Sequence, residues 1–419
     1  MEKIEGKEGY KKTELGLVPV EWDVVKLRSI VKTFAGGTPK RNNLLFYKGE
    51  IPWVKSGEVN QNYIFKTEEY ISKLGLEESS AKMISKGSIL MALYGATAGQ
   101  VSMLMIEAAA NQAVLSINSI NKKVINIYIY HYLKANRNKI LSIVQGSGQP
   151  NLSKEIINNV YIPLPLPLEQ QKIARILSCW DKAIEKTEKL INARTKLKKG
   201  LMQKLLTGKK RFKEFIKSQS YKKTEIGKLP EDWQILKASD IFKNYSDKNH
   251  PEEELLSATQ DKGVLPRNML EGRVMMPEGD VKTYKLVNKG DFVISLRSFQ
   301  GGIEHSEYRG IVSPAYTVLK NIIPIEQQYY KYLFKSVDFI SRLSVAVIGI
   351  RDGKQISYND FAELSLYYPS IEEQQKIASV LSTCDREMKL LENKLNSLKN
   401  QKKGLMQKLL TGQIRVTVV

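Results

Sequence analysis

The 419-residue sequence has few of the side chains that build disulfide frameworks, metal centres and acid–base catalytic sites. It contains two cysteines, Cys179 and Cys384, too few for a disulfide framework or for a zinc site with ordinary ligand numbers. The three histidines, His131, His250 and His305, have no neighbours at metal-ligand spacing. The sequence therefore predicts no metal site and gives no support to a metalloenzyme.

Long apolar runs and nucleotide-binding motifs are also missing. No apolar run approaches the ~18 residues of a membrane-spanning helix, and residues 1–6 lack the apolar core of a signal peptide. There is no P-loop, no Rossmann fingerprint, and no Pro-Pro dipeptide of the kind that adenine methyltransferases use. We therefore expect a soluble, cytoplasmic protein that is not an enzyme, binds no membrane and holds no cofactor of its own.

The charge balance is strongly positive. Lys and Arg number 65 against 44 Asp and Glu, which gives a formal net charge of +21 and an isoelectric point near 9.5. Each Lys or Arg placed against a phosphate releases a counterion, so an excess of this size favours a polyanionic partner. Nucleic acid is the partner that this composition indicates first.

The sequence repeats itself once. Residues 10–22 recur 211 positions later as residues 221–233, with eight of 13 positions identical. Residues 169–208 recur at an offset of 204 as residues 373–412, with 22 of 40 positions identical and no gap. The stretches between these segments are largely dissimilar. The pattern indicates a tandem duplication in which two variable domains alternate with two fixed segments.

Both fixed segments have the apolar spacing of long helices that pack against each other. Apolar residues alternate at spacings of four and three, and Gly208 and Gly412 stand in helix-stop positions. Two alternatives stay open: each helix caps only its own domain, or the two helices pair in parallel. Halves related by a two-fold axis favour antiparallel pairing. Gly200 and Gly404 lie inside the segments, where they indicate a bend, a close backbone approach or a helix break. The predicted helix-pair interface consists of Ile173, Leu177, Ile184, Ile191, Ile377, Leu381, Met388, Leu391, Leu395 and Leu398.

The variable domains mix short strand-like runs with helical segments and polar loops, which predicts mixed α/β globules. Strands are expected within residues 88–94, 111–117 and 291–296, and helices within residues 124–141 and 327–343. Exposed loops that carry cations and amides are candidates for DNA contacts, since arginine suits guanine and glutamine suits adenine. The candidate DNA-binding residues are Thr38, Lys40, Arg41, Lys55, Gln149, Arg297, Gln300, Arg351, Lys354 and Gln355.

Together these features resemble the specificity subunit of Type I restriction–modification systems. The most specific likeness is in Glu-Gln-Gln-Lys-Ile-Ala and Lys-Gly-Leu-Met-Gln-Lys-Leu-Leu-Thr-Gly, both present in each fixed segment. Weaker likeness lies in Gly36-Gly37-Thr38-Pro39, in Ile51-Pro52-Trp53 and in residues 297–302, 313–316 and 354–357. The resemblance covers nearly the whole chain.

The resemblance implies a division of the chain into four parts. Residues 1–168 would form a first target-recognition domain and residues 169–208 a central spacer helix. Residues 209–372 would form a basic linker with a second target-recognition domain, and residues 373–419 a distal spacer helix with a tail. The expected fold is mixed α/β, with two globular domains joined by two long antiparallel helices in a pseudo-two-fold tandem repeat.

The resemblance also implies a function. Each domain would read one half of a bipartite, asymmetric site in double-stranded DNA, and the helices would set the spacer. Two methyltransferase subunits and the motor-nuclease restriction subunits would bind the chain; S-adenosylmethionine, ATP and Mg²⁺ would belong to those partners. Two other interpretations stay open: a self-contained enzyme, for which Glu278-Gly279-Asp280-Val281-Lys282 offers a nuclease-like triplet, and a general DNA- or RNA-binding coiled-coil scaffold.

Overall fold

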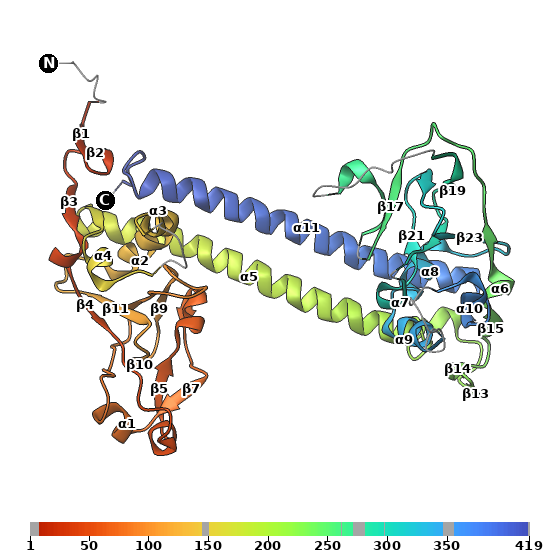
Figure 1. Ribbon diagram of the computed structural model, residues 1–419, viewed down its shortest axis with the longest axis horizontal. Coiled ribbons are helices and arrows are strands. Elements are labelled where there is room, and N and C mark those ends of the chain that lie inside the picture. The colour runs from red at the N-terminus through yellow and green to blue at the C-terminus, as the bar shows by residue number, and fades with distance from the viewer. Residues whose placement is uncertain are drawn as a thin grey trace. The chain divides into compact units, whose positions relative to one another are not determined.

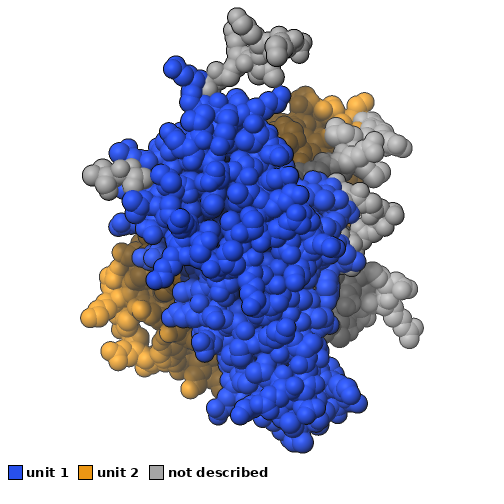
Figure 2. All heavy atoms as spheres, turned by 90° about the vertical axis from the view of Figure 1, so that its left-hand side faces the viewer, with its two compact units in different colours: residues 1–188, 393–419 blue, residues 189–392 orange. Residues whose placement is uncertain are grey.

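The chain forms two compact units, each with one mixed α/β domain and parts of two long helices (Figures 1 and 2). Unit 1 comprises residues 1–188 and 393–419, and unit 2 comprises residues 189–392. The computed structural model describes residues 8–144, 151–260, 262–270, 281–296, 298–346 and 356–417, without the side chains of Phe299 and Ala346. No helix in these ranges is both long enough and apolar enough to span a bilayer.

Short strands dominate the domain of unit 1. The strands are β1 (Tyr10–Thr13), β2 (Gly16–Pro19), β3 (Asp23–Lys26), β4 (Val31–Ala35), β5 (Ile51–Val54), β6 (Tyr63–Ile64), β7 (Glu69–Ile71), β8 (Ile89–Ala92), β9 (Val101–Leu104), β10 (Ala109–Ala110), β11 (Val114–Ser119) and β12 (Tyr161–Leu164). The helices are α1 (Lys73–Glu77), α2 (Asn126–Ala135), α3 (Arg137–Ser142), α4 (Lys154–Asn158) and the start of α5 (Pro167–Leu205).

The domain of unit 2 has the same kind of composition. The strands are β13 (Tyr221–Thr224), β14 (Gly227–Pro230), β15 (Gln234–Lys237), β16 (Phe242–Tyr245), β17 (Leu256–Thr259), β18 (Gly263–Pro266), β19 (Lys285–Val287), β20 (Phe292–Ile294), β21 (Glu304–His305), β22 (Gly310–Val312), β23 (Thr317–Asn321) and β24 (Ser365–Tyr368). The helices are α6 (Ala238–Ile241), α7 (Ser298–Gly301), α8 (Gln327–Leu333), α9 (Val337–Ala346), α10 (Tyr358–Ala362) and the start of α11 (Ile371–Leu409).

The two domains share a central sheet and differ around it. Strand order β4-β11-β8-β9 in unit 1 corresponds to β16-β23-β20-β21 in unit 2, and the pair β3-β12 corresponds to β15-β24. Unit 1 adds β6 to the central sheet and a separate sheet β10-β5-β7, whereas unit 2 adds the hairpin β17-β18 and the pair β19-β22. Strands and helices occur in all five places where the sequence predicts them. The mixed α/β tandem repeat is confirmed.

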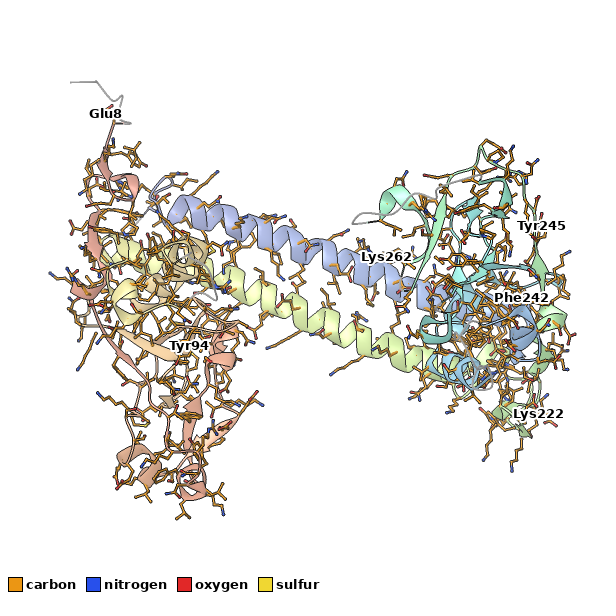
Figure 3. All side chains as sticks on the ribbon, viewed as in Figure 1. Glu8, Tyr94, Lys222, Phe242, Tyr245 and Lys262 are labelled. Atoms are coloured by element: carbon orange, nitrogen blue, oxygen red, sulfur yellow. The ribbon has the colours of Figure 1, made fainter. Side chains whose placement is uncertain are left out.

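Aromatic rings fill the core of the second domain. Phe242, labelled in Figure 3, makes edge-to-face contacts with Phe292 at 5.5 Å and with Tyr330 at 5.3 Å between ring centroids. The first domain instead uses mainly aliphatic side chains between its sheet and α2. The shared frame therefore tolerates two different cores.

The long helices α5 and α11 are antiparallel in each unit. In unit 1 the ammonium of Lys402 bonds Asp181, and that of Lys399 bonds Glu188 at 2.7 Å. Residue numbers therefore rise along α5 as they fall along α11. In unit 2 Arg194 lies 3.5 Å from Glu387, and Lys198 pairs with Asp385 in the same descending order. The predicted antiparallel pairing is confirmed.

The glycines of the fixed segments have two different roles. Gly208 and Gly412 lie beyond the last helical residues with φ of +67° and +73°, which is the predicted helix stop. Gly200 and Gly404, by contrast, lie inside uninterrupted helices, and a Cβ at either position would meet no atom within 4 Å. The expected break or close backbone approach at these two glycines is wrong.

The repeated Glu-Gln-Gln-Lys-Ile-Ala motif joins each helix to its domain. The Trp22 indole donates to Glu169 at 3.0 Å in unit 1, as the Trp233 indole donates to Glu373 at 2.8 Å in unit 2. The side chain of Gln170 accepts from the backbone of Ile125 at 2.9 Å, which satisfies polar groups that the apolar core would otherwise leave unpaired. These contacts explain why the Glu, the first Gln and the Trp recur in both copies.

Candidate nucleic-acid interface

The loop that follows β4 carries three of the predicted DNA-binding residues, Thr38, Lys40 and Arg41. Its first residues are locked against the domain: a Cβ on Gly36 would lie 2.2 Å from the carbonyl oxygen of Ala110, so no larger residue fits there. The carbonyl of Gly37 accepts a 3.0 Å hydrogen bond from the buried Trp53 indole. The Thr38 hydroxyl donates to the side-chain oxygen of Gln112. The loop is thus an exposed segment on a rigid base.

Arg41 projects from this loop beside two aromatic rings that contact each other. Its guanidinium carbon lies 4.6 Å from the Tyr47 ring centroid and 5.0 Å from that of Trp53. Its Nη1 donates to Glu69 at 2.7 Å, while the Arg41 side chain keeps 56% of its surface exposed. The Tyr47 hydroxyl donates to the Pro39 carbonyl at 2.6 Å, so the ring under the guanidinium is itself held.

Lys55, the residue that follows strand β5, approaches the same carboxylate. Its ammonium lies 2.8 Å from Glu68 and 3.1 Å from Glu69. Partial burial works to raise the pKa of Glu69, but hydrogen bonds from Arg41 and Lys55 outweigh it and lower the pKa below the ordinary value. Hydrogen bonds to Glu68 and Glu69 in turn raise the pKa of Lys55. Glu69 and Lys55 are therefore both charged at neutral pH.

The structure brings Arg41 and Lys55 together and adds partners that the sequence did not indicate. Glu69 and Tyr47 were not predicted as site residues, because only the folded chain places β7 and the turn Leu44–Tyr47 beside the loop. In Figure 1, α1, β5 and β7 lie at the end of the first domain remote from α5. Lys40 is exposed on the same loop.

Of the DNA-binding residues predicted in the second domain, Gln300 is the one that lies in the described part of the chain. It lies on α7, where its side-chain oxygen accepts a 3.2 Å hydrogen bond from Gln260. Gln260 precedes the turn that carries Lys262, labelled in Figure 3. The ammonium of Lys335 ties the two segments together by donating to the carbonyls of Gln260 at 3.0 Å and Gly301 at 2.7 Å. Five predicted residues lie outside the described part of the chain: Gln149, Arg297, Arg351, Lys354 and Gln355.

The predicted helix-pair residues divide between two environments. Four are almost fully buried where the helices meet their domains: Ile173, Leu177, Ile377 and Leu381. Ile173 and Leu177 share a core with Leu409 and Leu410 at the end of α11. Six lie half-buried farther along the helices: Ile184, Ile191, Met388, Leu391, Leu395 and Leu398.

The arrangement offers fixed hydrogen-bond donors on exposed loops. Within the described ranges, no three His, Cys, Asp or Glu side chains are grouped so that they could hold a metal ion. Arg, Lys and Gln side chains presented in this way are the groups that contact phosphates and base edges. The chemistry that these surfaces support is binding.

Comparison with known proteins gives consistent matches over most of the chain. The family model described as "Type I restriction modification DNA specificity domain" matches residues 19–193 and again residues 230–400. The Type I restriction enzyme MjaVIII specificity subunit of Methanocaldococcus jannaschii is 29% identical over 98% of this chain and 96% of its own length. The putative MjaX specificity subunit of the same organism is 26% identical, again over 98% of this chain and 97% of its own length.

A solved structure has the same fold. The crystal structure of the Type I restriction–modification S subunit from M. genitalium superposes with a TM-score of 0.58. It covers 95% of this chain and 97% of that chain at 17% identity.

Proposed function

The chain belongs to the Type I restriction modification DNA specificity family, and on that premise we propose that its two domains each read one half of a bipartite, asymmetric DNA site. The chain recognises DNA sequence as part of a Type I restriction–modification system. The observation that carries the proposal is that two domains on one frame present unlike surfaces: the Arg41–Glu69–Lys55 cluster in one and the Gln260–Gln300 pair in the other. Unlike surfaces suit unlike half-sites. Two modest specificities on one chain combine into a high one.

The helices α5 and α11 would set the spacer between the half-sites. Support comes from the ordered ion pairs along the helices, Asp181–Lys402 and Glu188–Lys399 in unit 1 and Arg194–Glu387 in unit 2. Side-chain pairs of this kind fix the register of two antiparallel helices. A fixed register gives a fixed spacer length.

Two copies of a methyltransferase subunit would bind the chain, one at each unit. Support comes from exposed residues that are identical in both fixed segments although nothing in the core requires them. The unit 1 set is Gln171, Lys172, Lys403, Gln407 and Lys408, and the unit 2 set is Gln375, Lys376, Lys199, Gln203 and Lys204. Because the variable domains have diverged, a surface kept twice indicates one partner bound twice.

The chain itself would carry no catalytic step. S-adenosylmethionine would be held by the methyltransferase subunits, and ATP and Mg²⁺ by restriction subunits that join the complex for cleavage. Consistent with this, the cationic and amide groups described above have the chemistry of DNA contact.

The test is to co-express the chain with the candidate methyltransferase subunit from the same genome and to map methylated adenines by sequencing. We expect one bipartite motif. A Lys172→Glu/Lys408→Glu variant should bind one methyltransferase copy instead of two, whereas Lys186→Glu, an exposed helix position that differs between the copies, should still bind two. Methylation by the chain alone would indicate a self-contained enzyme, and binding that follows salt without sequence preference would indicate a general nucleic-acid scaffold.

A further inference from the structure

Arg41 differs from an ordinary surface arginine because its guanidinium is held in one place. A free arginine side chain loses rotamer entropy when a ligand fixes it in one conformation. Here the Tyr47 and Trp53 rings face the guanidinium, and Glu69 accepts from its Nη1 at 2.7 Å. The cost of ordering is therefore met in the free protein, before any ligand binds.

The guanidinium remains available to a ligand. Arginine has five N–H donors, and in the described part of the chain Glu69 supplies the one side-chain acceptor that Arg41 bonds. With 56% of its side chain exposed, Arg41 has N–H donors left for a ligand beyond the one that bonds Glu69. Two parallel donors match the O6 and N7 acceptors of guanine in the major groove.

The charge around Arg41 argues against a phosphate contact. Arg41 and Lys55 are balanced by Glu68 and Glu69, so the cluster has no net formal charge. Phosphate binding depends on uncompensated positive charge, and the Glu69 carboxylate beside Nη1 would repel a phosphate. A base edge carries no net charge and meets no such repulsion.

We infer that Arg41 reads a guanine in the half-site of the first domain, with Glu69 and Lys55 as positioning residues that hold it. The inference rests on the proposed function, because it requires that the first domain contacts one half-site. Lys40, the exposed neighbour of Arg41, is then a phosphate contact, and it provides a matched control.

The test compares three variants with the wild-type chain, each co-expressed with the methyltransferase subunit: Arg41→Ala, Arg41→Lys and Lys40→Ala. We expect both Arg41 variants to lose a single guanine from one half of the motif, with discrimination against other bases falling roughly 5- to 150-fold. Arg41→Lys keeps the charge but lacks the parallel donors, so it should not rescue. Lys40→Ala should weaken binding to all sequences alike. It should also reduce the slope of log affinity against log salt concentration by about 1, the value of one phosphate contact.

A second measurement changes the DNA, and its first part uses the wild-type chain, so that part does not depend on how well a variant folds. Wild-type complex is bound to its motif DNA with each guanine replaced in turn by 7-deazaguanine, which lacks the N7 acceptor. We expect one position in one half-site to lose affinity, and Arg41→Lys to be insensitive to that replacement.

Several outcomes would overturn the inference. Retained guanine preference in Arg41→Lys would show a simple cationic contact, and an even loss on all sequences in Arg41→Ala would show a phosphate contact. A half-site without guanine would also refute it. In each of these cases the wild-type chain still reads a motif; a wild-type chain that reads none refutes the proposed function itself.

Discussion

Lys402 on α11 donates a 2.5 Å hydrogen bond to Asp181 on α5, and the two side chains are only 7% and 3% exposed. The same pair recurs 204 positions away as Lys198 with Asp385 in unit 2, where the side chains are 20% and 41% exposed. One interaction therefore occurs twice in different environments. The repeat supplies its own control experiment.

Removing the lysine should be more costly in unit 1. Lys402→Ala leaves Asp181 buried without its closest cation, and breaking a buried pair costs about 3–5 kcal/mol. Lys198→Ala leaves Asp385 in contact with water, and an exposed pair is worth about 1 kcal/mol or less. Urea unfolding of the two variants measures the difference. Equal losses would show that the burial of Asp181 does not determine the stability of the helix pair.

His131 should make the protein less stable in mild acid. Burial lowers the pKa of His131 to about 3, and the nearby Asp181 carboxylate offsets this only in part. The unfolded chain, with a histidine pKa of about 6.5, therefore binds the proton first as the pH falls. The contribution of His131 to stability is fully present above about pH 6.5 and is lost as the pH falls toward about 3.

Urea unfolding between pH 7 and pH 5 compares wild type with His131→Gln. The wild-type chain should lose up to about 1.4 kcal/mol more per pH unit than the variant. His250→Gln is the control of opposite sign: a hydrogen bond to Asp247 raises the pKa of His250, so its contribution is present below about pH 6.5 and is lost as the pH rises. Parallel pH profiles for wild type and His131→Gln would contradict the assignment of a buried neutral imidazole.

Replacing the interior glycines of the helices should stabilise them. Gly200→Ala and Gly404→Ala each add a methyl group that meets no atom within 4 Å, and alanine is favoured over glycine inside a helix by about 1 kcal/mol. Gly208→Ala should do the reverse, because φ is +67° there and the new Cβ would lie 2.6 Å from Pro230. Thermal unfolding distinguishes the two groups; a loss of stability in Gly200→Ala would indicate an unrecognised contact.

Adding one heptad to both long helices should lengthen the spacer of the recognised site. Seven helical residues add about 10 Å, which corresponds to about three base pairs at 3.4 Å each. The half-site sequences should not change. Mapping of methylated adenines in the lengthened chain gives the spacer directly, and an unaltered spacer would refute the idea that the helices measure it.

The sequence predicted the helices well because their determinants are local. The internal repeat bounded the segments at 169–208 and 373–412, and their apolar periodicity identified them as helices, which are observed at Pro167–Leu205 and Ile371–Leu409. The glycine stops fall where expected. The Gly200 and Gly404 expectation failed because a single glycine costs less than the surrounding helix and its packing contribute. The site could be predicted only in part from the sequence. Glu69 meets Arg41 because β5 pairs with β7, and no local sequence pattern encodes that contact.

The most direct test of the central claim, that each domain reads one half-site, is a domain exchange. Residues 23–166 are replaced by the corresponding domain of the MjaVIII specificity subunit, and the methylated motif of the chimaera is mapped in complex with the methyltransferase subunit. We expect one half-site to change while the other half-site and the spacer stay as in the wild type. Changes in both half-sites, or in neither, would contradict the assignment of one half-site to each domain.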